Sequence, residues 1–286
     1  MSNMPSKTWF ITGASRGLGL TLTRLLLALG QNVAATSRNR AQLERAVAPT
    51  ADQFLRFLPL EADLTDEDNV GAAVGQTVKA FGAVDVVVNN AGYGLQGTVE
   101  ALTDAELRRN FDVNVFAPLN VLRKMLPQLR RQRSGHIINI ASIVGFQGGY
   151  AGWGSYVATK FALAGLTESL AAETRELGIK ATVIYPGPVR TDFLADGSLA
   201  VAQHAIDDYT AAQASLDLHL GTLAGNQAGD PDKLAELIVR VAAAENPPLH
   251  LFPGNISWDL AYQKLGEVKL DLAAWKDASL ATDFPR

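Results

Sequence analysis

Seven short apolar runs recur along this chain of 286 residues, and longer segments with helical periodicity separate them. This alternation is typical of βαβ units, in which helices cover both faces of a parallel sheet. Most runs lack a strict polar alternation, as expected of strands that are buried on both sides. The sequence therefore predicts an α/β fold with a doubly wound, seven-stranded parallel sheet, its strands at Thr8–Thr12, Val33–Thr36, Phe54–Pro59, Val84–Val88, His136–Ile140, Ala181–Tyr185 and Leu249–Phe252.

Local signals mark the ends of several helices. Capping boxes, in which a threonine and an acid three residues later exchange hydrogen bonds, are expected at Thr65 with Asp68 before a helix at Val70–Phe81, and at Thr103 with Glu106 before the next helix. A later helix is expected at Pro231–Ala244. Left-handed residues that close helices are expected at Gly30, Gly82 and Gly178.

The chain contains no internal repeat and no low-complexity linker, so we expect one domain over residues 1–286. An excursion at 191–229 carries mixed helical and loop signals between a strand end and the next clear helix. Such a segment often covers a site, although it could equally be a surface excursion without a role. The segment at 255–286 has helical character, and it either closes the substrate side or extends an interface.

Composition excludes several classes of function. The net charge is -4 and no basic tract appears, so nucleic acid is not an expected partner. The chain has no cysteine and its four histidines lack metal-ligand spacing, so neither a disulfide nor a metal site is expected. Met1–Thr8 lacks the features of a signal peptide and no stretch is apolar for long enough to span a membrane, which predicts a cytoplasmic protein.

A glycine-rich turn lies between the first predicted strand and the apolar helix that runs to Leu29. Glycines at such a junction let the backbone approach a pyrophosphate closely, and the helix N-terminus offers unpaired N–H groups and a positive dipole end. Because the turn stands in the first βαβ unit, we expect it to bind a dinucleotide rather than to be a plain tight turn. The residues of this loop are Gly13, Ser15, Arg16, Gly17, Leu18 and Gly19.

The end of the second strand carries Thr36-Ser37-Arg38, where a fold that selects NAD usually offers an acid to the ribose 2′-hydroxyl. Arg16, Arg38 and the Ser37 hydroxyl could instead hold a 2′-phosphate through charge-assisted hydrogen bonds. Either arginine taken alone could be a solvated surface charge. Because no acid stands at the end of the second strand, the joint presence of Arg16 in the glycine loop and Arg38 indicates a site for a 2′-phosphate. The sequence therefore predicts NADPH as the preferred cofactor over NADH.

A candidate acid–base group follows the fifth strand. Ser142 lies just beyond the C-terminal end of that strand, where ligands of parallel sheets bind. Tyr156 and Lys160 open the next helix, and their four-residue spacing places them on one face. A tyrosine pKa of about 10 is too high for efficient proton exchange near neutral pH, but a lasting positive charge on Lys160 would favour the phenolate. Ser142 would then polarise a carbonyl oxygen by hydrogen bonding.

Taken together, these motifs resemble the short-chain dehydrogenase/reductase family in its single-domain branch, from about Thr8 to Gly254. The resemblance implies a Rossmann fold and hydride transfer between nicotinamide and the carbon of a carbonyl or secondary alcohol. It is carried by TGASRGLG at 12–19, DL at 63–64, NNAG at 89–92, Asn114, Ser142, YVATK at 156–160 and PG at 186–187.

The family resemblance also implies roles for individual residues. A proton relay would comprise Asn114, Ser142, Tyr156 and Lys160, and Asp63 with Leu64 would lie near adenine. The remaining cofactor contacts would be Asn90, Ala91, Gly92, Tyr156, Lys160, Pro186, Gly187, Val189 and Thr191. Asp63 could instead begin a turn, Asn90 could satisfy backbone groups, and Pro-Gly is a turn signal anywhere. The family's usual dimer helices would be Val113–Leu129 and Val157–Leu177, which implies a homodimer or homotetramer.

The substrate is a small carbonyl compound or alcohol, expected to be lipophilic, and its identity stays open. One hypothesis is a ketone or aldehyde reductase, and another is a dehydrogenase of hydroxysteroid-like or retinol-like alcohols, which PPLHLFPG at 247–254 resembles. A regulator that binds NADP without turnover is the alternative from another class. Thirteen residues separate Ser142 from Tyr156, one more than is usual in the family, so the substrate wall is expected to be reshaped. Its candidate residues are Tyr150, Trp153, Phe193 and His204, although each of them could equally be a packing or surface residue.

Overall fold

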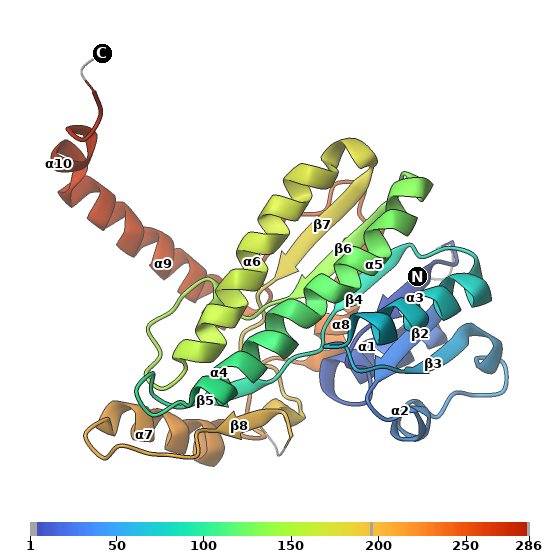
Figure 1. Cartoon of the computed structure of the whole chain (residues 1–286), viewed down its shortest axis with the longest axis horizontal. Coiled ribbons are helices and arrows are strands. Elements are labelled where there is room, and N and C mark those ends of the chain that lie inside the picture. The colour runs from blue at the N-terminus through green and yellow to red at the C-terminus, as the bar shows by residue number, and fades with distance from the viewer. Residues whose placement is uncertain (1–4, 195–196, 285–286) are drawn as a thin grey trace.

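The computed structural model describes residues 5–194 and 197–284, so the ends of the predicted domain and two residues of the predicted excursion lie outside the described residues. Its main sheet has seven parallel strands in the order β3-β2-β1-β4-β6-β7-β9, which confirms the predicted fold class (Figure 1). The strands are β1 (Thr8–Ile11), β2 (Asn32–Ser37), β3 (Phe57–Glu61), β4 (Val86–Asn89), β6 (Gly135–Ile140), β7 (Ile179–Ile184) and β9 (His250–Leu251).

Helices pack on both faces of this sheet through two separate apolar clusters. The first cluster joins one face to α1 (Gly17–Ala28), α2 (Arg40–Val47) and α8 (Pro231–Ala243). The second joins the other face to α3 (Glu67–Phe81), α5 (Ala117–Gln132) and α6 (Gly154–Thr174). Both clusters take alternate side chains from β1, where Trp9 and Ile11 face one layer and Phe10 the other. The near-continuous apolar strands of the sequence therefore reflect burial on both sides.

The third strand begins later than the sequence predicts. Phe54–Arg56 forms a short 3₁₀ turn, and Phe54 and Leu55 are exposed. Pairing with β2 starts at Phe57, whose partner is Val33. The apolar run thus mixes an exposed turn with a buried strand, and hydrophobicity alone does not separate the two.

Two of the predicted helix starts have different outcomes. The capping box at Thr103 and Glu106 is present at the start of α4 (Asp104–Phe111). The predicted box at Thr65 and Asp68 is wrong, because the Asp66 side chain accepts hydrogen bonds from the backbone N–H groups at the start of α3. Thr65 instead donates its hydroxyl to Asp63. Positive φ angles at the ends of their helical segments confirm the three closing residues Gly30, Gly82 and Gly178.

The helix predicted at Val113–Leu129 is present, but it is the later part of a longer helical segment that contains a π-helical turn. Asp112–Phe116 forms a π-helical turn between α4 and α5. Such turns widen a helix locally and often occur at functional sites. Short 3₁₀ turns also occur at Ile143–Gly145, Arg175–Leu177 and Asp192–Leu194.

The excursion after β7 is attached to the body by strand pairing. Its β8 (Leu199–Val201) pairs in parallel with β5 (Gly94–Gln96) in a second sheet of two strands. Further along, α7 (Thr210–Asp217) leads into a π-helical turn at Leu218–Leu223, and a bridge joins Val189 to Gly229. The segment therefore lies at the end of the sheet beyond the strands' C-termini (Figure 1).

The C-terminal part of the chain leaves the body. Helix α9 (Asn255–Ala274) and the short α10 (Lys276–Leu280) extend away from the sheet and its helices (Figure 1). The first turn of α9 is fixed, because the Ser257 hydroxyl donates a 2.5 Å hydrogen bond to the Tyr185 carbonyl. All residues from 265 to 284 are exposed.

Candidate active site

The glycine loop between β1 and α1 has a shape that only glycine allows at two points. Gly13 has a φ of +67°, and a Cβ there would lie 2.8 Å from the Cα of Ala91. A Cβ on Gly19 would lie 2.5 Å from the Gly13 carbonyl oxygen. Since Arg16 precedes α1 without capping it through its side chain, the first N–H groups of the helix stay available. The loop is therefore shaped as an anion cradle at a helix N-terminus.

Asn90 holds this loop against the neighbouring strand end. Its side-chain amide donates hydrogen bonds of 2.9 and 3.0 Å to the carbonyl oxygens of Thr12 and Gly13. The Thr12 hydroxyl accepts hydrogen bonds from the backbone N–H groups of Asn90 and Ala91. Asn90 thus satisfies backbone groups, as its alternative interpretation predicts, and by doing so it fixes the cradle's form.

The end of β2 offers cations and hydroxyls without an acid. Ser37 accepts a hydrogen bond from the Asn39 backbone N–H, and Arg38 is exposed beside the same cavity. Asp63 accepts two hydrogen bonds from Thr65, and these bonds, helped by the positive charge of Arg38, hold the pKa of that carboxyl below its ordinary value. Asp63 therefore begins a turn and also lines the cavity.

Arg16 has a contact that the sequence does not predict. Its guanidinium donates a hydrogen bond to the Gly197 carbonyl oxygen, at the start of the described second part of the excursion. A Cβ on Gly197 would lie 3.2 Å from an Arg16 terminal nitrogen, so the approach is close. Arg16 therefore links the glycine loop to the excursion, and it also lines the cavity.

Tyr156 and Lys160 lie in the first two turns of α6, and both are buried. The Lys160 ammonium donates a 2.9 Å hydrogen bond to the Ile140 carbonyl oxygen and stands 5.7 Å from the centroid of the Tyr156 ring. Ser142 follows β6 and its hydroxyl interacts with the Tyr156 phenol. The three side chains predicted to act together are brought together at the C-terminal end of the sheet.

Burial changes the proton affinities of this pair. Desolvation raises the pKa of Tyr156 above its ordinary value, although the hydrogen bond with Ser142 opposes the shift. Desolvation also lowers the pKa of Lys160 to about 8. Lys160 is therefore still charged at neutral pH, but its charge does not favour the phenolate in the protein alone, because burial dominates the pKa of Tyr156. The phenol is held in its protonated form, which can donate a proton.

Asn114 lies in the π-helical turn and behind the cavity rather than in its wall. Its side-chain amide donates to the Tyr93 carbonyl oxygen at 2.9 Å and to the Thr159 hydroxyl at 3.1 Å. Its side-chain oxygen accepts from the Tyr93 backbone N–H at 3.0 Å. Asn114 thus joins the strand end after β4 to the helix that carries Tyr156 and Lys160.

A cavity of about 1100 Å³ unites these groups. It runs from the glycine loop and the end of β2, past Ser142, to the excursion and the first turns of α9. Of the predicted site residues, Gly19 and Asn114 do not line it. The predicted residues that do are Gly13, Ser15, Arg16, Gly17, Leu18, Ser37, Arg38, Asp63, Leu64, Asn90, Ala91, Gly92, Ser142, Tyr156, Lys160, Pro186, Gly187, Val189 and Thr191.

The far wall of the cavity combines three predicted aromatic residues with side chains that the sequence did not single out. Tyr150, Trp153 and Phe193 line it, and the Phe193 ring lies 5.7 Å from that of Tyr156. His204 does not line it, which contradicts its prediction; His219 does, with its ring 4.7 Å from that of Trp153. The other lining residues missed are mostly apolar and include Ala211, Ala214, Ser215, Leu218, Leu223, Ile256 and Leu260.

A hydrogen bond from Trp153 holds the excursion in this wall, and a second one lies within the excursion. The Trp153 indole N–H donates to the Ser215 hydroxyl at 3.1 Å, and His219 Nδ1 lies 2.7 Å from the Ser215 carbonyl oxygen. The sequence indicates that the excursion contains helix. Only the tertiary contacts show that one side of this helix lines the cavity.

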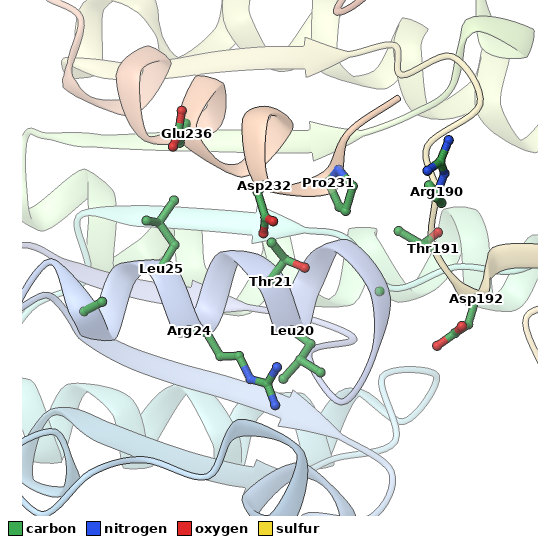
Figure 2. A pocket seen from close by; sticks show the side chains of 12 residues that line it. Leu20, Thr21, Arg24, Leu25, Arg190, Thr191, Asp192, Pro231, Asp232 and Glu236 are labelled. Atoms are coloured by element: carbon green, nitrogen blue, oxygen red, sulfur yellow. The ribbon is translucent and has the colours of Figure 1, made fainter. Parts of the chain in front are cut away.

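A second hollow of about 600 Å³ lies between α1 and α8, on the outer side of the first layer. Figure 2 shows Leu25 of α1 pointing toward α8, which carries Asp232 and Glu236, whereas Arg24 points away from α8. Gly17 and Thr191 border both hollows. The side chains of the candidate acid–base group are absent from its lining, so the chemistry belongs to the larger cavity.

The described residues hold no cluster of three or more His, Cys, Asp or Glu side chains that could bind a metal ion. Across residues 5–194 and 197–284, no helix is both long and apolar enough to cross a bilayer.

Known proteins resemble this chain over most of its length. A family model described as short chain dehydrogenase matches residues 7–200. The oxidoreductase BOA17 of Botryotinia fuckeliana is 34% identical over 277 residues, which cover 97% of this chain and 99% of that protein. A short-chain dehydrogenase of known structure from Streptomyces avermitilis has 34% identity and a TM-score of 0.88, with 99% of this chain and all of that one covered. An alcohol dehydrogenase from Thermococcus sibiricus, solved with 5-hydroxy-NADP, has 25% identity and a TM-score of 0.70, covering 86% of this chain and 95% of that one.

Proposed function

This chain belongs to the short-chain dehydrogenase family, and from that premise we propose that it is an NADPH-dependent reductase of lipophilic ketones or aldehydes with Tyr156 as its proton donor. The observation that carries the proposal is the single cavity that joins the glycine cradle to the buried phenol of Tyr156. A dinucleotide in the cradle and a carbonyl compound against the phenol would occupy the two ends of one space.

The residues present fit a nicotinamide dinucleotide. The backbone approach at Gly13 leaves a concavity that a Cβ would fill, at the N-terminus of a helix with no acid in its first turn. Among the described residues, the buried side-chain oxygens of Thr36 and Gln227 have no hydrogen-bond partner, and both residues line the cavity. Buried polar atoms without a partner are costly and point to a ligand that supplies one.

The preference for NADPH rests on charge at the end of β2. Ser37 and Arg38 line the cavity there, and β2 itself ends without an acid that would repel a 2′-phosphate. Arg38 already supplies enough positive potential to help hold the pKa of Asp63 low. A guanidinium beside a phosphate forms strong charge-assisted hydrogen bonds, so Arg38 is the residue proposed to bind the 2′-phosphate of NADPH.

Each of the acid–base residues has a separate part in the proposed reaction. Bound NADPH supplies the hydride that reduces the carbonyl carbon. The Tyr156 phenol donates the proton to the carbonyl oxygen, and its raised pKa keeps that proton in place beforehand. The Ser142 hydroxyl holds the same oxygen, and the Lys160 ammonium, 5.7 Å from the ring, stabilises the phenolate left behind. Asn114 positions this helix through Thr159.

The substrate end of the cavity supports a lipophilic compound. Its wall combines aromatic rings with aliphatic side chains, among them Trp153, Phe193, Leu218 and Leu260. Burial of apolar substrate surface against such a wall contributes roughly 25 cal/mol per Å². The few polar groups near the phenol then orient the carbonyl.

The proposed function is tested by measuring NADPH and NADH consumption over a series of aliphatic, aryl and steroid ketones, for the protein and for Tyr156→Phe. We expect turnover with NADPH on the more apolar ketones, and loss of turnover in Tyr156→Phe with the affinity for NADPH retained. Full activity in Tyr156→Phe would refute the assignment of the proton donor. Binding of NADPH without turnover on any ketone would favour a regulator.

A further inference from the structure

Ser215 and His219 form a polar pair in the apolar part of the cavity wall. Ser215 belongs to α7 and His219 to the π-helical turn that follows it, and both line the cavity. Their spacing of four residues puts the two side chains on one face of this helical segment. The neighbours that line the cavity from the same segment are apolar, namely Ala211, Ala214, Leu218 and Leu223. A polar pair in such surroundings is costly unless its hydrogen-bonding groups find partners.

One ring nitrogen of His219 is already bound. Nδ1 lies 2.7 Å from the Ser215 carbonyl oxygen, and since a carbonyl oxygen can only accept, Nδ1 carries the hydrogen. In the neutral imidazole Nε2 is then a hydrogen-bond acceptor, and it points away from the helix that Nδ1 binds. No group in residues 5–194 and 197–284 forms a hydrogen bond with Nε2. His219 therefore offers the cavity an acceptor.

The Ser215 hydroxyl offers the opposite function. Its oxygen accepts a 3.1 Å hydrogen bond from the Trp153 indole N–H. An indole nitrogen only donates, so this contact does not use the hydrogen of the hydroxyl. Nor does the hydroxyl donate to another group in the part of the chain that the structure describes. The pair thus presents a donor and an acceptor side by side, which suits a hydroxyl group, because a hydroxyl can accept from one and donate to the other.

A single aromatic ring separates this pair from the proposed proton donor. The centroid of the Trp153 ring lies 4.7 Å from that of His219 and 6.1 Å from that of Tyr156. A molecule whose carbonyl meets the Tyr156 phenol can therefore pass along Trp153 and reach His219 within the same cavity. The Tyr150 hydroxyl in this wall is already engaged, because it donates to the Gln147 side chain at 3.2 Å.

We propose that Ser215 and His219 form a second polar subsite, which selects ketones that carry a hydroxyl group at the far end of an apolar skeleton. This inference rests on the proposed function, since it takes the carbonyl group to lie against Tyr156. The substrate hydroxyl donates to His219 Nε2 and accepts from the Ser215 hydroxyl, while the skeleton packs on Trp153. A substrate that is apolar throughout would remove water from both groups without replacing their hydrogen bonds, which costs free energy. The pair therefore discriminates between hydroxylated and plain ketones.

The proposal is tested with three methyl ketones that differ at one position: para-hydroxybenzylacetone, benzylacetone and para-methoxybenzylacetone. The methoxy compound keeps the oxygen that accepts from Ser215 but has no hydrogen for His219. We expect kcat/KM of the protein to be about tenfold higher for the hydroxy compound than for either of the others, which is the effect of one hydrogen bond of ordinary strength. Homologues with one or two further methylene groups are included, so that the set contains hydroxyls of different reach.

Two substitutions of His219 separate the subsite from mere support of the wall. His219→Asn keeps an amide N–H that can replace Nδ1 on the Ser215 carbonyl, but it has no atom at the position of Nε2. His219→Gln can place its amide oxygen at that position. We expect the preference for the hydroxy compound to be lost in His219→Asn and largely kept in His219→Gln. His204→Asn is the matched control and should keep the preference, because His204 is an exposed histidine of the excursion that does not line the cavity.

Three kinetic results would overturn the subsite while leaving the reductase assignment intact. They are equal kcat/KM on the hydroxy compound and benzylacetone, equal kcat/KM on the hydroxy and methoxy compounds, and a loss in His219→Asn that is the same for all three ketones. Calorimetric titration of the ketones into the protein with NADP⁺ requires no turnover. Tighter binding of the hydroxy compound that His219→Asn removes, without turnover on any ketone, would support the subsite and refute the proposed reductase.

Discussion

Replacement of Lys160 with methionine is expected to change stability in a way that depends on pH. Burial lowers the pKa of the Lys160 ammonium from 10.5 to about 8. Because the unfolded chain then binds more protons than the folded one between pH 8 and 10.5, the stability of the protein rises with pH across that window. Below pH 8 the cost of holding the charge in the fold is fully present.

The magnitude follows from the size of the shift. One pKa unit corresponds to about 1.4 kcal/mol, so the buried charge costs about 3 kcal/mol at pH 7 and about 1 kcal/mol at pH 10. Methionine has a similar length and no charge, so Lys160→Met removes this dependence. The free energy of unfolding of the variant minus that of the protein should therefore fall by about 2 kcal/mol from pH 7 to pH 10.

The assay is chemical unfolding followed by circular dichroism at both pH values and at one protein concentration. Lys79→Met is the control for the substitution itself, since Lys79 is an exposed lysine of α3 and its replacement removes no buried charge. A difference for Lys160→Met that does not change with pH would refute the assignment of a buried, charged lysine. Lys160→Met should also lose reductase activity, because no cation then stabilises the phenolate of Tyr156.

Three further changes test other parts of the molecule. Arg38→Asp should lower kcat/KM with NADPH about tenfold or more while affecting NADH less, and an equal loss with both cofactors would contradict phosphate reading by Arg38. Gly13→Ala should weaken NADPH binding, measured by fluorescence titration, because its Cβ would lie 2.8 Å from the Cα of Ala91. Gly30→Ala is the control, because Gly30 has a similar φ but open space around it. That substitution should lower the free energy of unfolding by about 1 kcal/mol through backbone strain and leave NADPH binding intact. Burial and two nearby lysines lower the pKa of His136 to about 3. The free energy of unfolding should therefore fall as the pH drops below 6.5, by about 2 kcal/mol at pH 5. Chemical unfolding of His136→Leu should not show this decrease.

The parts of the site that could be predicted from sequence were those fixed by position along a strand. Gly13 and Ser142 each follow a strand end, and all strands of the main sheet run in parallel, so both had to meet at one edge. The four-residue spacing of Tyr156 and Lys160 then placed them on one helix face. The fold itself followed from the alternation of apolar runs and helical segments.

Other features depend on contacts between distant segments. His219 reaches the cavity because Ser215 binds Trp153, and nothing near His219 in the sequence indicates that contact. The strand Gly94–Gln96 is three residues long, which is too short for a periodic signal. The depressed pKa of Lys160 comes from burial by the assembled layers, so residue type alone indicates the charge at neutral pH but not how much burial weakens the hold on that proton.

The pairing of β5 with β8 makes the substrate wall an exchangeable module for protein engineering. One attachment of the excursion is this small sheet, closed by the hydrogen bond from the Ala202 N–H to the Gln96 carbonyl oxygen. The other is the bridge between Val189 and Gly229. Residues 203–226 lie between the two attachments, so a library that varies this segment and keeps both anchors should change which small molecules fit the cavity and leave the glycine loop, Ser142, Tyr156 and Lys160 unaltered.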